Sequence, residues 1–200
     1  MRFFLNILFG GLLFLQGFGQ DIISNPTDLP TANIFSPTAD YSLINDFRGL
    51  EFDVENSKVS FNFVHDKTSG TISGLDFKIN FNPKDPDNAT FKGTALIKTL
   101  DTDNFIRDGH LMWEKFFYKK KYPKIAFAST HVVHFGTDTY KVIGNLTIKG
   151  KTKEVIITFS LDAQRLLGKT TIFTSDYGIH IHEEREKNKL DIKFYFPILL

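Results

Sequence analysis

From residue 50 onward, apolar residues recur at every second position in short runs that turn residues separate. Alternation of this kind predicts strands with one apolar and one polar face. The apolar positions, run by run, are Leu50, Phe52, Val54; Val59, Phe61, Phe63; Leu75, Phe77, Ile79, Phe81; Phe91, Ala95, Ile97; Ile125, Phe127, Ser129; Val142, Leu146, Ile148; Val155, Ile157, Phe159, Leu161; and Leu190, Ile192, Phe194, Phe196. About eight such strands predict an all-β fold, an antiparallel β-barrel in preference to a two-sheet sandwich.

The breaks between the runs carry residues that favour turns. The predicted turns are Glu55-Asn56-Ser57, Thr68-Ser69-Gly70, residues 82–88, Gly136-Thr137-Asp138, Lys149-Gly150-Lys151 and Leu167-Gly168.

One stretch, residues 99–130, departs from the alternation. Within it Leu111, Met112, Trp113, Phe116 and Phe117 fall at roughly helical spacing. We expect Asp101 or Asp103 to cap a turn and residues 122–123, Tyr-Pro, to end the helix. This short helical crossover would place an aromatic plug over one end of the barrel.

Three pieces of the chain together resemble one family. They are LDTDNFIRDGHLMWEKFF from residue 100, KYPKIAFAST from residue 121 and YKVIGNLTIKG from residue 140. They are similar to the YceI-like, polyisoprenoid-binding proteins, and the resemblance extends over residues 51–196. It implies a lipocalin-like antiparallel barrel that holds a long apolar ligand. One position departs from the family pattern, because Thr174 stands where an Arg usually precedes Asp-aromatic-Gly.

The first residues form a region of their own. Arg2, an apolar run to Phe18 and small residues at 17–19 predict a signal peptide over residues 1–19. The alternative is a membrane anchor, for which the run is marginally short. Residues 20–40, rich in Pro, Ser, Thr and Asn, predict an extended or disordered leader, and residues 41–200 the barrel domain. We therefore expect a periplasmic or secreted protein.

Charge and composition exclude several classes of function. Without residues 1–19 the chain carries 23 basic and 23 acidic residues, because Arg2 is removed from the 24 basic ones. A balanced charge argues against a bulk electrostatic partner such as nucleic acid or an anionic membrane, while transient contact with a membrane stays open. The absence of Cys excludes disulfides, thiol catalysis and thiolate metal sites. Five of the 22 Phe lie in residues 1–19, and the other 17 are still a high aromatic load for a core or a cavity.

Histidines offer the clearest metal candidates, but the pattern favours solvation. His180 and His182 would share one face of a strand, with Glu183 or Glu184 nearby. The strongly charged run that follows is more typical of two solvated histidines, so we expect no metal and no cofactor other than the bound lipid. His131 and His134, three positions apart, would point to opposite faces of a strand.

Nothing in the sequence predicts catalysis. It has no G-x-S-x-G motif, its Ser129-Thr130-His131 run lies in a predicted strand, and no pair of carboxylates stands out. No glycine-rich phosphate loop is present either. We expect a protein that is not an enzyme.

The sequence therefore predicts a protein that binds, stores or transports a long apolar lipid, an isoprenoid such as a quinone or a polyprenyl lipid. The alternative is a structural or interaction protein of the cell envelope with a filled barrel. The predicted ligand-facing residues are Phe77, Ile79, Phe81, Phe91, Ile97, Phe127, Val142, Leu146, Phe159, Ile192 and Phe194, with Trp113 and Phe117 near the mouth. Arg107, Asp108 and His110 match the family's Arg-Asp-x-His-Leu pattern and have either a structural or a head-group role. Lys119, Lys120, Lys121 and Lys124 form either a solvated face or a rim that attracts a head group. The sequence does not predict the oligomeric state.

Overall fold

A computed structural model of the chain describes residues 49–199. The predicted signal peptide and leader, residues 1–40, lie outside the described residues. Within residues 49–199 the strands are β1 (Lys58–Phe63), β2 (Thr68–Ile72), β3 (Leu75–Asn80), β4 (Thr90–Leu96), β5 (Leu100–Asp101), β6 (Lys124–His134), β7 (Thr139–Ile148), β8 (Lys151–Asp162), β9 (Arg165–Phe173) and β10 (Lys189–Pro197). The helical elements are α1 (Phe105–Leu111) and the 3₁₀ turns η2 (Pro86–Asn88), η3 (Ile97–Thr99), η4 (Thr174–Tyr177) and η5 (Arg185–Asn188).

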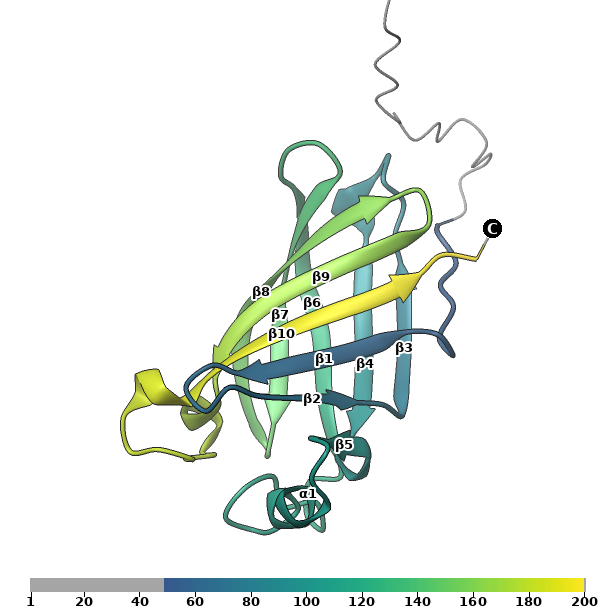
Figure 1. The fold of residues 1–200 in the computed structure, drawn as a ribbon. Coiled ribbons are helices and arrows are strands. Elements are labelled where there is room, and N and C mark those ends of the chain that lie inside the picture. The colour runs from purple at the N-terminus through teal and green to yellow at the C-terminus, as the bar shows by residue number, and fades with distance from the viewer. Residues whose placement is uncertain (1–48, 200) are drawn as a thin grey trace, which may run out of the picture. The chain divides into compact units, whose positions relative to one another are not determined.

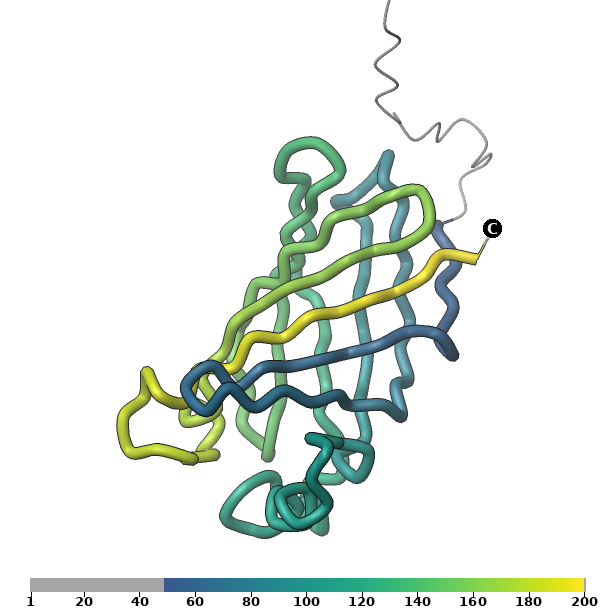
Figure 2. Tube along the Cα trace, in the orientation of Figure 1, coloured from purple at the N-terminus to yellow at the C-terminus, as the bar shows by residue number. Residues whose placement is uncertain are grey.

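The ten strands form a single antiparallel sheet that curls around one apolar interior (Figures 1 and 2). The strand order is β3-β4-β6-β7-β8-β9-β10-β1-β2-β5. This confirms the predicted antiparallel barrel-like fold, with ten strands in place of about eight. Helix α1 lies at one end of the curled sheet (Figure 1). Among residues 49–199, no helix is long and apolar enough to cross a membrane.

A corner and a strap tie the two ends of the edge strand β3 to other parts of the sheet. At the corner, Gly74 adopts a positive φ of 62° between β2 and β3, and its carbonyl accepts a hydrogen bond from Leu96 N–H (3.3 Å). At the other end, Leu50 N–H donates to the Phe81 carbonyl (2.8 Å), while Phe52 bridges to Ile198 beyond β10. The strap at residues 50–53 is therefore not one of the barrel strands that the alternation predicted. It instead links β10 to the end of β3.

Two predicted turns are wrong, and both errors involve a glycine inside a strand. Residues 68–70 open β2, and residues 167–168 lie in the middle of β9. Gly70 pairs with Phe61 of β1, and Gly168 pairs with Phe159 of β8. Glycine within a strand marks a close approach by another group as often as a turn, and here that group is an aromatic ring.

The helical part of the crossover also lies earlier than predicted. Helix α1 ends at Leu111, and residues 112–117, which include Trp113, Phe116 and Phe117, form successive turns after it. Asn104, and neither predicted aspartate, caps the helix, because its side chain accepts a hydrogen bond from Arg107 N–H (3.0 Å). Asp101 does cap a turn, as predicted, because its carboxylate accepts a hydrogen bond from Asp103 N–H in the turn before the helix (2.9 Å).

Candidate functional site

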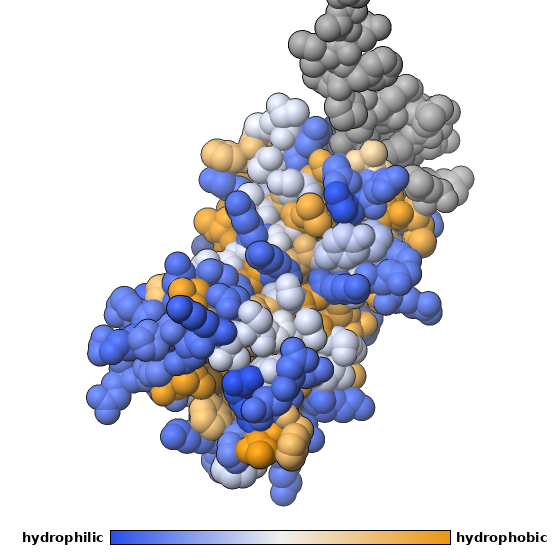
Figure 3. All heavy atoms as spheres, in the orientation of Figure 1, coloured by the Kyte–Doolittle hydropathy of each residue, from blue (hydrophilic) through white to orange (hydrophobic). Residues whose placement is uncertain are grey.

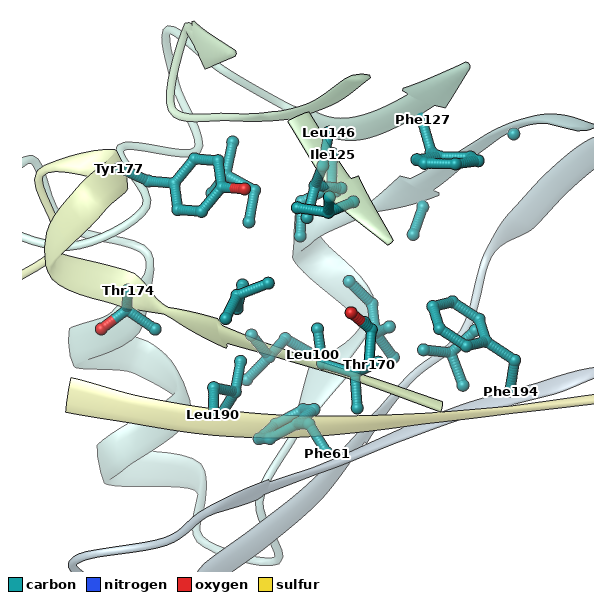
Figure 4. Close-up of a pocket in the computed structure, with 18 of the residues that line it drawn as sticks. Phe61, Leu100, Ile125, Phe127, Leu146, Thr170, Thr174, Tyr177, Leu190 and Phe194 are labelled. Carbon is teal, nitrogen blue, oxygen red and sulfur yellow. The ribbon is translucent and has the colours of Figure 1, made fainter. Parts of the chain in front are cut away.

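The interior of the curled sheet holds a cavity of about 440 Å³. Side chains from most of the strands and from the crossover line it, and most of them are apolar (Figure 4). Charged side chains in the lining are Asp66, Lys92 and Arg107. The walls therefore suit an apolar ligand in shape and in chemistry.

The structure brings nine of the predicted ligand-facing residues together around this cavity. They are Phe77, Ile79, Phe91, Phe117, Phe127, Leu146, Phe159, Ile192 and Phe194. They lie on β3, β4, β6, β7, β8, β10 and in the crossover, and the alternation that predicts the strands also predicts their inward direction.

The other four predicted residues lie outside the lining. Phe81 and Val142 are completely buried in the core beside the cavity, where the Phe81 ring packs against Tyr140 at 4.7 Å between centroids. Ile97 is buried in the turn η3, whose first N–H bonds to the Pro123 carbonyl. Trp113 is 60% exposed, and its ring lies 4.4 Å from that of His110 on the outer side of the crossover. Inward-pointing positions are thus divided between solid core and cavity wall, a distinction that periodicity cannot make.

Glycines within the strands provide seats for the aromatic side chains of the wall. A Cβ atom added to Gly168 would overlap the ring of Phe159, and one added to Gly144 would lie 2.6 Å from Cζ of Phe127. In both cases the added Cβ atom would lie closer to the ring than real Cβ atoms come to a neighbouring carbon atom. The two glycines therefore let the rings approach the neighbouring strand more closely than any residue with a Cβ atom would allow.

Arg107 and Asp108 hold the crossover through Thr102. The Thr102 hydroxyl donates to Asp108 Oδ1 (2.6 Å) and accepts from Arg107 Nε (2.7 Å), while Arg107 Nη2 donates to the Thr102 carbonyl (2.8 Å). Thr102 is buried, and its backbone N–H also donates to Asp108 Oδ1 (3.0 Å). Arg107 also lines the cavity, whereas Asp108 and the exposed His110 do not. The geometry favours the structural alternative for Asp108, and it leaves Arg107 at the cavity wall.

The turn η4 closes the same end of the barrel. Thr174, at the position where the family pattern usually has Arg, is buried and donates its hydroxyl to the Ile179 carbonyl (2.9 Å). Lys149 Nζ donates to the carbonyls of Gly178 and Lys115 (both 3.2 Å), so it ties this turn to the crossover. Burial lowers the pKa of Lys149, with the charge of Lys151 acting in the same direction. A local threonine bond and a distant lysine thus stabilise the turn without the arginine.

Sequence reasoning missed Tyr177, which the turn η4 places at the cavity wall. Its side chain is only 1% exposed, and its hydroxyl has no hydrogen-bond partner. Burial, together with the charge of Asp176, raises the pKa of Tyr177 to about 12. The signal that could have identified it is the Asp-aromatic-Gly sequence at residues 176–178, because the positive φ of Gly178 (75°) ends the turn.

Histidines come together in a different combination from the predicted one. His182 Nε2 lies 2.8 Å from Asp66 Oδ2, and the His182 ring packs against that of His65 at 4.7 Å. These three side chains form a donor set that a divalent metal could use, with ligand atoms within 4.8 Å of one another. His180 is exposed and is not part of this set. His131 and His134 are both exposed on β6, where a bulge at residues 129–131 shifts the register.

The outer side of the crossover carries an exposed apolar group. Phe105 is 85% exposed and Ile106 is 57% exposed at the start of α1, and Trp113 follows nearby in the chain. Lys119, Lys120 and Lys121 are exposed in the same crossover. In the space-filling view, apolar side chains gather among charged ones over the end of the molecule where α1 lies (Figure 3).

Comparisons with known proteins agree with this fold. A UPF0312 protein from Photorhabdus laumondii is 37% identical over 92 residues, which are 46% of this chain and 47% of that protein. The chain thus spans about half the length of this relative. The crystal structure of BcnA from Burkholderia cenocepacia is similar with a TM-score of 0.64 and 23% identity, over 74% of this chain and 99% of BcnA. A polyisoprenoid binding domain from Saccharophagus degradans, implicated in plant cell wall breakdown, is similar with a TM-score of 0.53 and 14% identity, over 76% of this chain and 98% of that domain.

A family comparison covers most of the chain. Residues 50–197 match the YceI-like domain, and this range includes every strand of the curled sheet. The chain therefore belongs to the YceI-like family.

Proposed function

We propose that this protein binds a long apolar lipid with an isoprenoid tail, such as a quinone or a polyprenyl lipid, and stores or transports it. The observation that carries the proposal is the cavity of about 440 Å³ with almost entirely apolar walls. The structural similarity to a polyisoprenoid binding domain supports it.

Burial of the tail supplies the binding free energy. Each isoprene unit has five carbon atoms and is worth roughly 4 kcal/mol when it leaves water completely, at about 0.8 kcal/mol per carbon. Association costs about 4–15 kcal/mol, so a tail of about four units outweighs that cost. Small ligands in practice gain only about 0.3 kcal/mol per atom. The realised gain is then about 1.5 kcal/mol per unit, or roughly tenfold in affinity.

The mechanism is partition of the lipid between water or membrane and the cavity, with no chemical step and no resident cofactor. Among the described residues, the cavity wall contains no His, Ser or Glu. Activation of a nucleophile needs a general base within hydrogen-bond reach. The Thr102 hydroxyl does donate to the Asp108 carboxylate, but it also accepts from Arg107 Nε, and these bonds hold the crossover in place. This arrangement supports a binding protein over an enzyme, and the open cavity favours it over the filled barrel of an interaction protein.

We further propose that the protein is exported and meets its lipid at a membrane surface. The apolar run and small residues within 1–19 support cleavage after Gly19 and a periplasmic or secreted location. The exposed Phe105, Ile106 and Trp113, beside three consecutive lysines, fit the boundary of an anionic bilayer. Sequencing the amino terminus of the periplasmic protein tests export, since a mature chain that begins at Gln20 is expected. Sedimentation with anionic vesicles tests docking, which a Phe105→Ser/Ile106→Ser variant should lose.

A series of prenyl alcohols of increasing length tests the central proposal. We expect the affinity, measured by titration calorimetry, to rise by roughly tenfold per isoprene unit from geranyl to geranylgeranyl. The gain should stop once the tail fills the cavity. Affinity that is independent of tail length would exclude burial of the tail as the source of binding.

A further inference from the structure

Among residues 49–199, two side chains of the cavity wall have a buried hydroxyl without a hydrogen-bond partner, Thr94 and Tyr177, and only Tyr177 is itself nearly fully buried (1% exposed). Its ring is held in the core with Ile148, Ile172 and Ile179, yet its hydroxyl has no hydrogen-bond partner. In the close-up view the hydroxyl oxygen points into the cavity, toward the side on which Ile125 and Leu146 lie (Figure 4). Because a buried hydroxyl without a partner costs folding free energy, a partner supplied by a ligand would restore that loss.

We propose that the Tyr177 hydroxyl recognises the lipid's polar end inside the cavity, by donating a hydrogen bond to a neutral carbonyl oxygen such as that of a quinone. This inference rests on the proposed function and narrows it, because it selects among isoprenoids by the chemistry of their head group.

Charge around the hydroxyl selects a neutral acceptor over a phosphate. Burial and the nearby negative charge of Asp176 raise the pKa of Tyr177, so the hydroxyl keeps its proton and acts as a donor at neutral pH. Asp176 is paired with Arg185 through two hydrogen bonds (2.7 and 2.8 Å), so this guanidinium is already occupied and is not available to a phosphate. The guanidinium of Arg107, which also lines the cavity, already donates two hydrogen bonds to Thr102. A carbonyl next to Tyr177 gains a donor without bringing a negative charge into the core.

The two apolar clusters of the barrel define the path of the tail. Tyr177 belongs to one cluster and Phe159 to the other, and both Phe127 and Val155 pack against both clusters. All four side chains line the cavity. A lipid whose carbonyl meets Tyr177 therefore extends its tail past Phe127 and Val155 toward Phe159.

A pair of tyrosine variants tests the proposal with tail-matched ligands. Tyr177→Phe removes only the hydroxyl, and Tyr140→Phe is its control, because Tyr140 is also buried (3% exposed) but lies outside the cavity lining. The ligands are a quinone with a geranylgeranyl tail, the corresponding hydrocarbon, and geranylgeranyl phosphate. We expect Tyr177→Phe to weaken quinone binding about tenfold and to leave hydrocarbon binding unchanged. The control variant should bind both as the wild type does.

An infrared measurement gives a second readout that folding defects do not mimic. The carbonyl stretch of the bound quinone should shift to lower frequency in the wild type, and the shift should be absent in Tyr177→Phe. Equal quinone affinity in the two proteins, or wild-type preference for the phosphate over the quinone, would overturn the head-group assignment while tail binding stands. Failure of the wild type to bind even the hydrocarbon would overturn the proposed function itself.

Discussion

Replacing Gly168 by alanine is expected to push the Phe159 ring off its seat on β9. The new Cβ atom would lie 2.8 Å from ring atom Cδ1 and 3.0 Å from Cζ, and even closer to Cε1, so the ring has to move. The strand lies behind the ring, and Phe91 is stacked on it at 5.3 Å between centroids. The space that remains is the cavity. Forced overpacking of this kind costs about 1–3 kcal/mol of unfolding free energy.

Urea unfolding, followed by circular dichroism, measures this loss, and two further variants isolate its cause. Gly109→Ala is the control, because a Cβ atom there meets nothing within 4 Å and lies in helix α1. It should leave stability unchanged or raise it by up to about 1 kcal/mol. Phe159→Leu should relieve the clash, so the double variant with Gly168→Ala should be about as stable as Phe159→Leu alone. If the two losses instead add to within about 0.5 kcal/mol, the ring and the glycine are independent and the reasoning fails.

Three other predictions follow from the cavity and its closed end. Val155→Asp places a carboxylate in the cavity and should abolish lipid retention. Ile156→Asp, at the next position, is the control and should retain lipid, because Ile156 is 52% exposed. Organic extraction and mass analysis of the two folded proteins measure how much lipid each retains. The pKa of Tyr177 is raised in the folded state to about 12, so only the unfolded chain loses this proton between about pH 10 and 12, and the urea midpoint should fall across that range. Tyr177→Phe should remove this part of the pH dependence, and an identical slope in both proteins would contradict it. Thr102→Val removes the hydroxyl that donates to Asp108. Amide hydrogen exchange should become faster in residues 102–111, while the strands stay protected. Unchanged exchange in residues 102–111 would show that this hydrogen bond does not hold the crossover.

The alternation of apolar residues predicted much of this architecture because the barrel has one inside and one outside. A period of two follows directly from the strand geometry, so residues such as Phe77 and Phe127 could be assigned to the interior without a structure. Gly70 and Gly168 misled the prediction of turns. The sequence around a glycine does not show that an aromatic ring from the next strand packs against it.

The candidate site could be predicted only in part, since a cavity is a property of packing. Phe81 and Phe91 have the same inward direction, yet one fills the core and the other lines the cavity. Tyr177 lies in a turn without periodicity, and nothing local reveals that its hydroxyl has no partner. The contact of His182 with Asp66 joins residues 116 positions apart, and spacing along the chain cannot indicate it.

Native mass spectrometry of the protein, purified from an exporting host without detergent, is the decisive test of lipid binding. We expect a discrete additional mass on the mature chain that extracts into organic solvent as a prenyl lipid. A chain that carries no lipid, and that stays bare after incubation with prenyl quinones and polyprenyl phosphates, would contradict the assignment of the cavity as a lipid site.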